Sequence, residues 1–435
     1  MPHDLPLIPL TWGQKAILGT IGDLGGQGRY FTIRRVIPLP TGDDDLARRM
    51  LWRFAETNES LRTVISEAGE PLTTQRIISP ERIRVDIATP VDAGDQAEHA
   101  RAAAARLARE PFDLTAEPPI RCSVIRAPGN DALLALAVSH FAVDAYALSL
   151  LSRWLSSPGG LDALTDRPPW QPRMQAAAEG ASSSGRRTER AITRWTTVLA
   201  DTPVVASPPA PERADRFVEW SLESATASDA IGATAERTET SPASVVLAIW
   251  CLALGLLDGR STVALTLISG NRHRDRERHY LGPMAQDTPM SVELRTGTFD
   301  DLVREVHREA LNAYADGRYD PALLAAAMGA PERTVRPPGK ILTFFNDARS
   351  EHPSDQPGRP PAGLRRIGHW ARLDLRRFLV LQQIGRTFRL RLLADTEVLT
   401  ADRIPALLQA MAEALVCAAS GARVGDLEHL LGRQL

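Results

Sequence analysis

The sequence predicts an α/β fold, with helices layered on sheets (α+β layering), in two lobes of similar size that meet at a cleft. Strand-like and helix-like hydrophobic patterns alternate in both halves of the 435-residue chain. The alternation stops between residues 156 and 187, where Pro, Gly and Ser are frequent. Because a chain of this length exceeds what one hydrophobic core usually organises, we expect an N-terminal lobe over residues 1–175 and a C-terminal lobe over residues 176–435.

The first half is predicted to contain two helices before its central strands. Thr11 and Gln14 have the spacing of a capping box, which favours a helix from Thr11. The acidic residues 43–45 suit the N-terminus of a second helix. Its buried stripe would be Leu46, Met50, Leu51 and Phe54. The other expected elements are strands at 29–37, 61–65, 75–78, 119–126 and 132–138, an Ala-rich helix at 94–109 and a helix at 145–155.

The second half has clearer signals at the ends of its elements. Ser241 suits an N-cap, Pro242 the first helical position and Gly259 the residue beyond the end, so a helix is expected over 243–257. A buried strand at 262–268 would end in a polar loop. A helix at 299–315 would bury Leu302, Val303, Val306, Ala310 and Leu311. The other expected elements are helices at 188–200 and 401–418 and strands at 217–222, 341–346, 378–384 and 387–393.

The composition is that of an ordinary soluble globular protein, with 43% hydrophobic and 24% charged residues. The 51 basic and 53 acidic residues give a net charge of −2, so charge alone does not favour nucleic acid or a membrane surface. Cys122, Cys251 and Cys417 are scattered without a CxxC pair, which disfavours a disulfide framework and a zinc site. We find neither a secretory signal from Met1 nor the ~20-residue apolar run that spans a bilayer, and therefore expect a cytoplasmic protein.

The residues around His140 are the best candidates for chemistry. A wholly apolar run at 133–138 ends in Ser139 and His140, and a helical pattern follows at 145–155. This strand–turn–helix places His140 and Asp144 on a connection, where rigid elements often present reactive groups. An imidazole titrates close to neutral pH, so we expect a general base or electrostatic stabiliser for acyl transfer. The alternatives are a core or loop histidine, and an aspartate that caps the helix or forms an ion pair.

Residues 139–145, Ser-His-Phe-Ala-Val-Asp-Ala, resemble the HHxxxDG motif of the condensation domains of nonribosomal peptide synthetases, which belong to the chloramphenicol-acetyltransferase-like superfamily. Further segments resemble motifs of that family in the family's order. They are 9–14 for "LSxxQ", 58–63 for "HExLRT", 111–114 with 118–121 for "PFDLxxxPLLR", 270–272 for a Gly-Arg pair and 281–283 for "IGxF". The resemblance covers essentially the whole chain.

The resemblance implies two chloramphenicol-acetyltransferase-like lobes in a V-shaped pseudo-dimer with a central tunnel, formed by a monomer. Peptidyl or acyl carrier proteins would dock at both ends of the tunnel and insert phosphopantetheine arms, so the protein itself would bind no cofactor and no metal. His140 would deprotonate or position the acceptor. Asp144, the second residue of the predicted catalytic motif, would be mainly structural and pair with an arginine of the other lobe, which by position is Arg272.

The implied activity is that of an acyltransferase in natural-product biosynthesis, which joins a carrier-bound acyl or aminoacyl thioester to an amine or hydroxyl acceptor as an amide or ester. Because the chain contains no adenylation or carrier segment, a free-standing enzyme is expected. Ser139 and Ala145, which support the site, depart from the motif by replacing its first His and its Gly. A side chain at position 145 would be costly if the backbone there needs a positive φ.

Two alternative functions stay open. One is a catalytically silent condensation-like domain that recruits carrier or tailoring proteins, and the other is an acyltransferase of this fold that uses coenzyme A thioesters. The basic stretch 272–279 is either a solvated loop or an electrostatic patch for an acidic carrier or a phosphate. Within it, His273 and His279 have no third ligand nearby, which disfavours a metal site.

Overall fold

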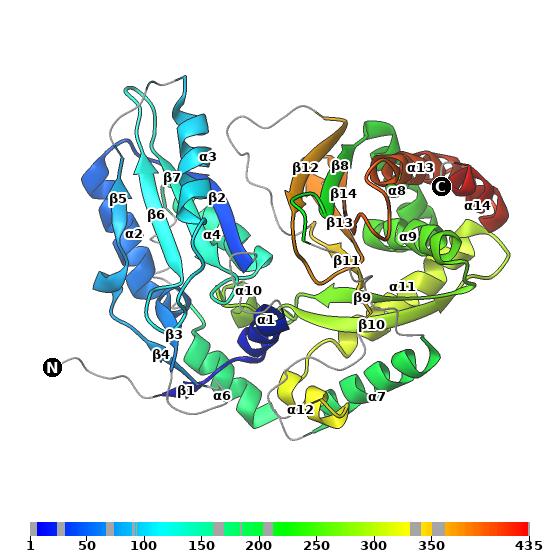
Figure 1. Cartoon of the computed structure of the whole chain (residues 1–435), viewed down its shortest axis with the longest axis horizontal. Helices are drawn as coiled ribbons and strands as arrows, with labels where there is room; N and C mark the ends of the chain where they lie inside the picture. The colour runs from blue at the N-terminus through cyan, green and yellow to red at the C-terminus, as the bar shows by residue number, and fades with distance from the viewer. Residues whose placement is uncertain are drawn as a thin grey trace.

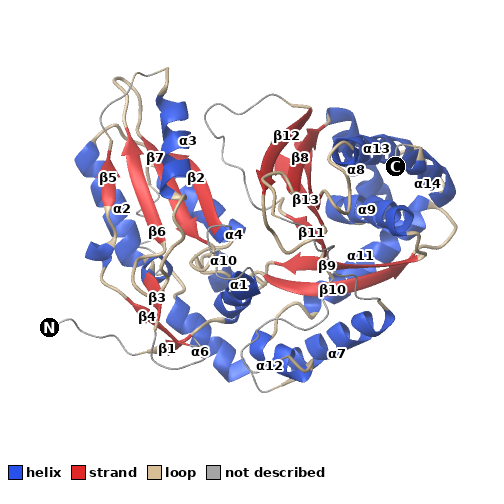
Figure 2. Cartoon of the chain, in the orientation of Figure 1, coloured by secondary structure: helices blue, strands red, loops and turns tan. Residues whose placement is uncertain are grey.

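The computed structural model shows two lobes side by side (Figure 1). It describes residues 7–23, 31–66, 74–88, 92, 94–159, 169–182, 185–202, 212–330, 341–349 and 362–433. Each lobe has sheets with helices packed on them (Figure 2), as the α/β prediction expected. The lobes diverge from their region of contact, which gives the expected V shape. The expectation of no secretory signal concerns the first residues of the chain, and residues 1–6 lie outside the described part.

The N-terminal lobe is built on a mixed sheet whose described strands have the order β2–β7–β6–β5. These strands are β2 (Thr32–Pro38), β5 (Val85–Ile87), β6 (Ile120–Ile125) and β7 (Leu133–Ser139). Leu134 of β7 packs in one core with α2 (Asp44–Thr57) and α4 (Ala145–Ser156). The next residue, Ala135, packs in another with α3 (Gln96–Leu107). Because successive side chains point to opposite faces, β7 is buried on both, as predicted.

A smaller antiparallel sheet of the same lobe carries the first helix. Its described strands, in the order β1–β4–β3, are β1 (Ile8–Pro9), β4 (Thr74–Ile77) and β3 (Thr63–Ile65). Helix α1 (Trp12–Asp23) follows β1 directly. The Thr11 backbone N–H donates to Gln14 Oε1 (2.8 Å), and the Gln14 N–H donates to Thr11 Oγ1 (3.2 Å). These reciprocal bonds confirm the predicted capping box.

The C-terminal lobe has a larger sheet, whose described strands have the order β10–β9–β11–β13–β14–β8–β12. The strands are β8 (Phe217–Glu223), β9 (Thr262–Ser269), β10 (Gln286–Glu293), β11 (Thr343–Asp347), β12 (Leu364–Trp370), β13 (Arg377–Ile384) and β14 (Thr387–Asp395). Helices cover one face of this sheet (Figure 2). They are α8 (Ala225–Thr238), α9 (Pro242–Asp258), α11 (Phe299–Ala315), α13 (Arg403–Ala418) and α14 (Val424–Gly432). The opposite face is turned toward the N-terminal lobe.

Helix α9 is the central helix of that core, and its ends are those predicted. Ser241 Oγ accepts from the Ser244 N–H (3.2 Å), Pro242 is the first helical residue, and Gly259 has a left-handed φ of 63° just beyond the end. Among the described residues, no single helix is long and apolar enough to cross a membrane. Helices α8 and α9 meet the length and apolar criteria only when taken together, as a pair bent by 104°.

Segments of the second half also reach the first lobe. Helices α6 (Pro172–Ser182), α7 (Arg186–Asp201) and α12 (Pro321–Ala327) lie along the bottom of the view in Figure 1. Leu281, which follows the short helix α10 (Asp275–Arg278), belongs to the core of the N-terminal lobe. The predicted boundary between residues 175 and 176 falls inside α6, and the placement of that boundary stays a prediction.

Some expectations about elements were wrong. Leu46 and Leu311 are 39% and 55% exposed, because the buried stripes of their helices run through Ala47 and Ala313 instead. Helix α6 forms inside the stretch 156–187, where the sequence shows no hydrophobic alternation and no helix was predicted. Its inward face carries the polar residues Gln175 and Glu179, so no hydrophobic period marks it. The other α-helices and strands that were not predicted are β1, β5, β10, β12, α8, α10, α12 and α14.

Candidate active site

His140 lies on the turn that joins β7 to α4, as the strand–turn–helix prediction expected. Its backbone N–H donates to the Phe31 carbonyl (2.7 Å). Ser139 Oγ accepts from the Phe141 N–H (3.3 Å), so the serine that replaces the first histidine of the motif stabilises the turn. Phe141 is fully buried beneath it. The backbone that carries His140 is therefore fixed by hydrogen bonds and by packing.

The Asp144 carboxylate connects the two lobes. Its Oδ1 accepts from the Ala147 N–H (2.9 Å), which makes Asp144 the N-cap of α4. Arg272 Nη1 and Nη2 donate to Oδ2 and Oδ1 (2.7 and 2.9 Å), so the pair predicted from the sequence is present. Oδ2 also accepts from the backbone N–H groups of Met284 and Ala285 (2.9 and 3.3 Å). The capping and the ion-pair interpretations of Asp144 are thus both correct.

These contacts keep Asp144 charged. Burial alone would raise its pKa, but the Arg272 guanidinium and the hydrogen bonds from Arg272, Met284 and Ala147 outweigh burial and hold the pKa below its usual range. The side chains of Arg272 and Asp144 are only 5% and 3% exposed. Arg272 also donates to the carbonyls of Gly270 (3.2 Å) and Gly282 (2.9 Å). A proton could reach Asp144 only if several of these bonds broke.

Asn271 positions Arg272 and was not predicted as a site residue. It has a left-handed φ of 54°, a conformation that is uncommon for a residue with a side chain. Its buried Nδ2 donates to the carbonyls of Met284 (3.0 Å) and Gly317 (2.9 Å), and its Oδ1 accepts from Ser269 Oγ (2.9 Å). The sequence signal was weak, because a polar loop after a buried strand does not reveal which side chain turns inward.

A cavity of about 730 Å³ between the lobes reaches His140, and its volume is in the range of small-molecule sites. The N-terminal lobe lines it with His140, Asp144, Ala145 and Tyr146, among others. The C-terminal lobe contributes apolar side chains from its sheet together with several aspartates. The Arg272 guanidinium, which also lines the cavity, lies 4.6 Å from the centre of the Tyr146 ring. His140 and the Asp144–Arg272 pair therefore border the same cavity.

The buried surroundings of His140 favour the neutral form of its imidazole. Burial lowers its pKa because the charged form loses hydration, while the Asp144 carboxylate and nearby backbone carbonyls oppose that shift only in part. The Phe31 ring, 6.2 Å from the imidazole between centroids, adds apolar surface beside it. A neutral imidazole at neutral pH retains the lone pair that a base needs.

Ala145, which replaces the glycine of the motif, is accommodated without backbone strain. It is the first residue of α4, and it is not among the described residues with a positive φ. A side chain at this position therefore does not have the conformational cost of a positive φ. Because Ala145 lines the cavity, its methyl group takes up space there instead.

The basic stretch after Arg272 is exposed in its first part and folds around a buried residue in its second part. Residues 273–276 are exposed, which agrees with the solvated-loop interpretation. Glu277 is buried, accepts from the backbone of Arg274 (2.9 Å) and pairs with Arg318 (2.8 Å), so the stretch folds around an internal carboxylate. Within the described residues, no group of three or more His, Cys, Asp or Glu side chains could hold a metal ion.

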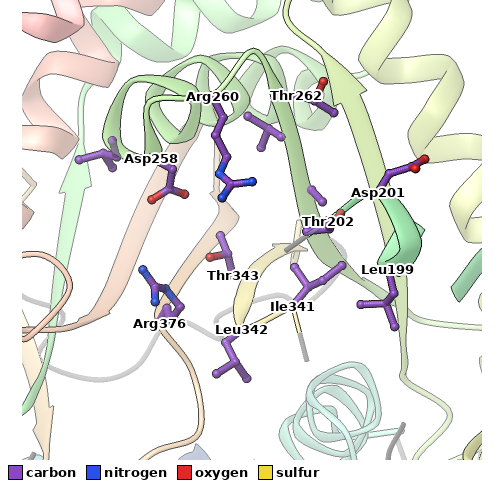
Figure 3. Close-up of a pocket in the computed structure, with 13 residues that line it drawn as sticks. Leu199, Asp201, Thr202, Asp258, Arg260, Thr262, Ile341, Leu342, Thr343 and Arg376 are labelled. Carbon is purple, nitrogen blue, oxygen red and sulfur yellow. The ribbon is translucent and has the colours of Figure 1, made fainter. Parts of the chain in front are cut away.

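A second cavity of about 370 Å³ opens in the C-terminal lobe, near the ends of α7 and α9 and the start of β11 (Figure 3). The Arg260 side chain reaches into it, and Arg376 lies at its edge, below the Asp258 carboxylate (Figure 3). Asp258 is bound by Arg377 through two hydrogen bonds of 2.9 and 3.0 Å. None of the residues that line this cavity lines the one at His140, so it is a separate feature of the C-terminal lobe.

Two peptide synthetases are similar in sequence to parts of this chain. The nonribosomal peptide synthetase kk1B of Curvularia clavata is 28% identical over 295 residues, which cover 61% of this chain and 2% of that protein. The phosphinothricin tripeptide synthetase PhsC of Streptomyces viridochromogenes is 28% identical over 294 residues, which cover 62% of this chain and 26% of that protein. The chain thus spans about a quarter or less of the length of these two relatives.

Structural and family comparisons agree with each other. The first condensation domain of the CDA synthetase matches with a TM-score of 0.72 and 18% identity, over 96% of this chain and 98% of that one, which supports the fold. The family model described as "Condensation domain" matches residues 40–347, well over half of the chain. The chain therefore belongs to the condensation-domain family.

Proposed function

We propose that this protein transfers an acyl group from a thioester on the phosphopantetheine arm of a carrier protein to an amine or hydroxyl acceptor, in the biosynthesis of a peptide-like natural product. The observation that carries the proposal is the position of His140, whose backbone is fixed on the turn between β7 and α4 and whose side chain borders the cavity between the lobes. Membership of the condensation-domain family supports the same chemistry. That the protein acts free-standing, as a monomer and in the cytoplasm stays a prediction.

In the proposed mechanism, His140 accepts a proton from the acceptor as its nitrogen or oxygen attacks the thioester carbonyl. A C–N or C–O bond forms, the C–S bond breaks, and the proton passes to the departing thiolate. Asp144 is a positioning residue, because its oxygens are already occupied by donors from both lobes. Its pair with Arg272 holds the start of α4, and with it the turn that carries His140.

The test is a single-turnover assay with an acyl-loaded carrier protein and an acceptor, run with the wild type, His140→Ala and His99→Ala. General acid–base catalysis typically contributes 10²–10⁴-fold, so we expect His140→Ala to lose roughly a hundredfold or more in rate. His99 is an exposed histidine of α3 and serves as the matched control, which should keep the wild-type rate. Product formation at the same rate in His140→Ala would contradict the catalytic assignment.

Other outcomes of this assay distinguish the two remaining hypotheses. Turnover with a free acyl–coenzyme A and no carrier protein would identify the donor as a coenzyme A thioester. Stable binding of a carrier protein without turnover of any acyl group would identify a recruiting domain. The geometry of the two departures from the motif is compatible with the proposal, because Ser139 bonds within the turn and Ala145 has no positive φ.

A further inference from the structure

The C-terminal lobe lines the cavity with a continuous apolar cluster, which we call the apolar wall. Its members come from β9, β11, the end of β12, the loop that follows β12, β13 and β14. They are Ile268, Phe344, Trp370, Leu373, Leu375, Phe378 and Leu393. The same cavity reaches His140 on the other lobe, so a substrate at His140 lies in the space that the apolar wall borders.

The apolar wall is preformed by the register of the sheet. Phe344 and Phe378 are partners across the parallel strands β11 and β13, so their side chains point to the same face. Their ring centroids lie 5.6 Å apart at a tilt of 58°, which is a favourable aromatic arrangement. Both rings therefore have a fixed place before any ligand arrives.

The apolar wall is also incompletely covered. Trp370, Leu373 and Phe378 are only partly buried, although they face the interior of the molecule. Apolar side chains that remain accessible in a cavity gain free energy when an apolar ligand removes their surface from water. An apolar group of a ligand can therefore cover the part of the apolar wall that is still accessible.

The charges around the cavity disfavour an anionic ligand. Arg272 and Arg391, which line it, are already paired with Asp144 and Glu219. Three carboxylates also line the same space, those of Asp287, Asp347 and Asp374, of which Asp347 is paired with Arg349 at 2.7 Å. A carboxylate on the ligand would lose hydration, and Arg272 and Arg391 could compensate that loss only by giving up the carboxylates that they already hold.

We propose that the acyl group transferred by this protein is apolar, an aryl or alkyl chain that lies on the apolar wall with its carbonyl at His140. This inference rests on the proposed acyl transfer. It concerns the donor, because the reacting end of the acceptor must keep an ionisable or hydrogen-bonding nucleophile, which an apolar surface does not stabilise. The acyl chain has no such group and can be fully buried.

The test measures binding to the wild-type protein without any turnover. The probes are the acetyl, hexanoyl and adipoyl amides of aminopantetheine, in which nitrogen replaces the thioester sulfur and no transfer occurs. Each buried methylene is worth about 0.8 kcal/mol, or about fourfold in affinity. We expect calorimetry to show hexanoyl binding at least about tenfold tighter than acetyl, and adipoyl, with the same chain length and a terminal carboxylate, at least about tenfold weaker than hexanoyl.

Two variants place the effect on the apolar wall. Phe378→Ser and, independently, Trp370→Ser should each remove most of the preference for hexanoyl while the acetyl probe binds as before. Leu311→Ser is the matched control, since Leu311 is an exposed leucine of α11 that does not line the cavity. It should keep the full preference. Thermal melts of each variant confirm that the comparison is between folded proteins.

The outcomes separate this inference from the proposed function. Equal affinity for acetyl and hexanoyl in the wild type, or adipoyl binding as tightly as hexanoyl, would overturn the apolar donor while leaving catalysis by His140 intact. An unchanged preference in both folded wall variants would overturn the location. Conversely, a clear hexanoyl preference in a protein whose turnover does not depend on His140 would support the wall and contradict the proposed mechanism.

Discussion

At the scale of single residues, the Asp144–Arg272 pair illustrates how the site depends on a charge that takes no part in proton transfer. Asp144→Ala removes the partner of a buried arginine and the N-cap of α4 together. We expect the free energy of unfolding to fall by about 3–5 kcal/mol, and the transfer rate to fall as well. Urea denaturation and the single-turnover assay measure the two effects.

A matched control for this substitution is Glu56→Ala. Glu56 pairs with Arg53 at 2.8 Å on the surface of α2, where both side chains are more than a third exposed. Exposed pairs contribute less than about 1 kcal/mol, so this variant should be nearly as stable as the wild type. A large loss of rate in Asp144→Ala with unchanged stability would contradict the positioning role and favour direct participation of the carboxylate.

The lowered pKa of His140 predicts where activity is lost in acid. Burial in the folded protein lowers the pKa of His140 below its usual value of about 6.5. The imidazole can therefore act as a base until the pH falls below this lowered pKa. The acid limb of the kcat/KM profile should therefore lie below pH 6.5. In the same range the unfolded chain binds the proton first, so this group makes the fold less stable as the pH falls. An acid limb at or above pH 6.5 would contradict the assigned environment.

How far the site could be predicted depended on the kind of residue. His140, Asp144 and Arg272 were predictable because each occupies a position within a recognisable motif. Asn271 was not, since its role arises from a left-handed backbone and from carbonyls that are 13 and 46 residues away along the chain. The effect of Ala145 depended on its φ, which no sequence pattern reports.

At the scale of elements, predictions succeeded where the burial was apolar and local signals marked the ends. Helix α9 combines an apolar surface with a serine cap, a proline and a terminal glycine, and all of these act as expected. Helix α6 shows the opposite case. Its buried Glu179 accepts from the Trp12 N–H at the start of α1 (2.7 Å), and burial raises the pKa of Glu179 to about 7. A helix that docks through polar contacts has no hydrophobic period to detect.

At the scale of the whole molecule, the relation between the lobes is fixed by a segment of the second half that inserts into the first. Leu281 enters the core of the N-terminal lobe, and Tyr280 beside it is fully buried. The amides of Met284 and Ala285 then bind Asp144. The V shape could be predicted from the family resemblance, whereas this insertion joins residues more than 100 positions apart and leaves no local signal.

This insertion predicts that a small change in α1 will disturb the site. A Cβ added at Gly13 would lie 2.1 Å from the Pro283 carbonyl oxygen, much closer than real contacts allow. Gly13→Ala should therefore push the inserted segment away from α1, although alanine favours a helix. Overpacking of this kind costs about 1–3 kcal/mol. We also expect a slower transfer rate, because Met284, next to Pro283, donates to the Asp144 carboxylate that positions His140.

Gly232→Ala is the matched control, since Gly232 also lies within a helix, α8, and an added Cβ there would meet nothing within 4 Å. Its substitution should raise stability by about 0.5–1 kcal/mol through helix propensity alone and leave the rate unchanged. Thermal melts and single-turnover rates of both variants decide the matter. If Gly13→Ala matched Gly232→Ala in stability and rate, this would contradict the claim that the packing of α1 on the inserted segment positions the two lobes. Helix propensity favours alanine at both positions, so a loss of stability or rate in Gly13→Ala alone measures the contact between α1 and the inserted segment.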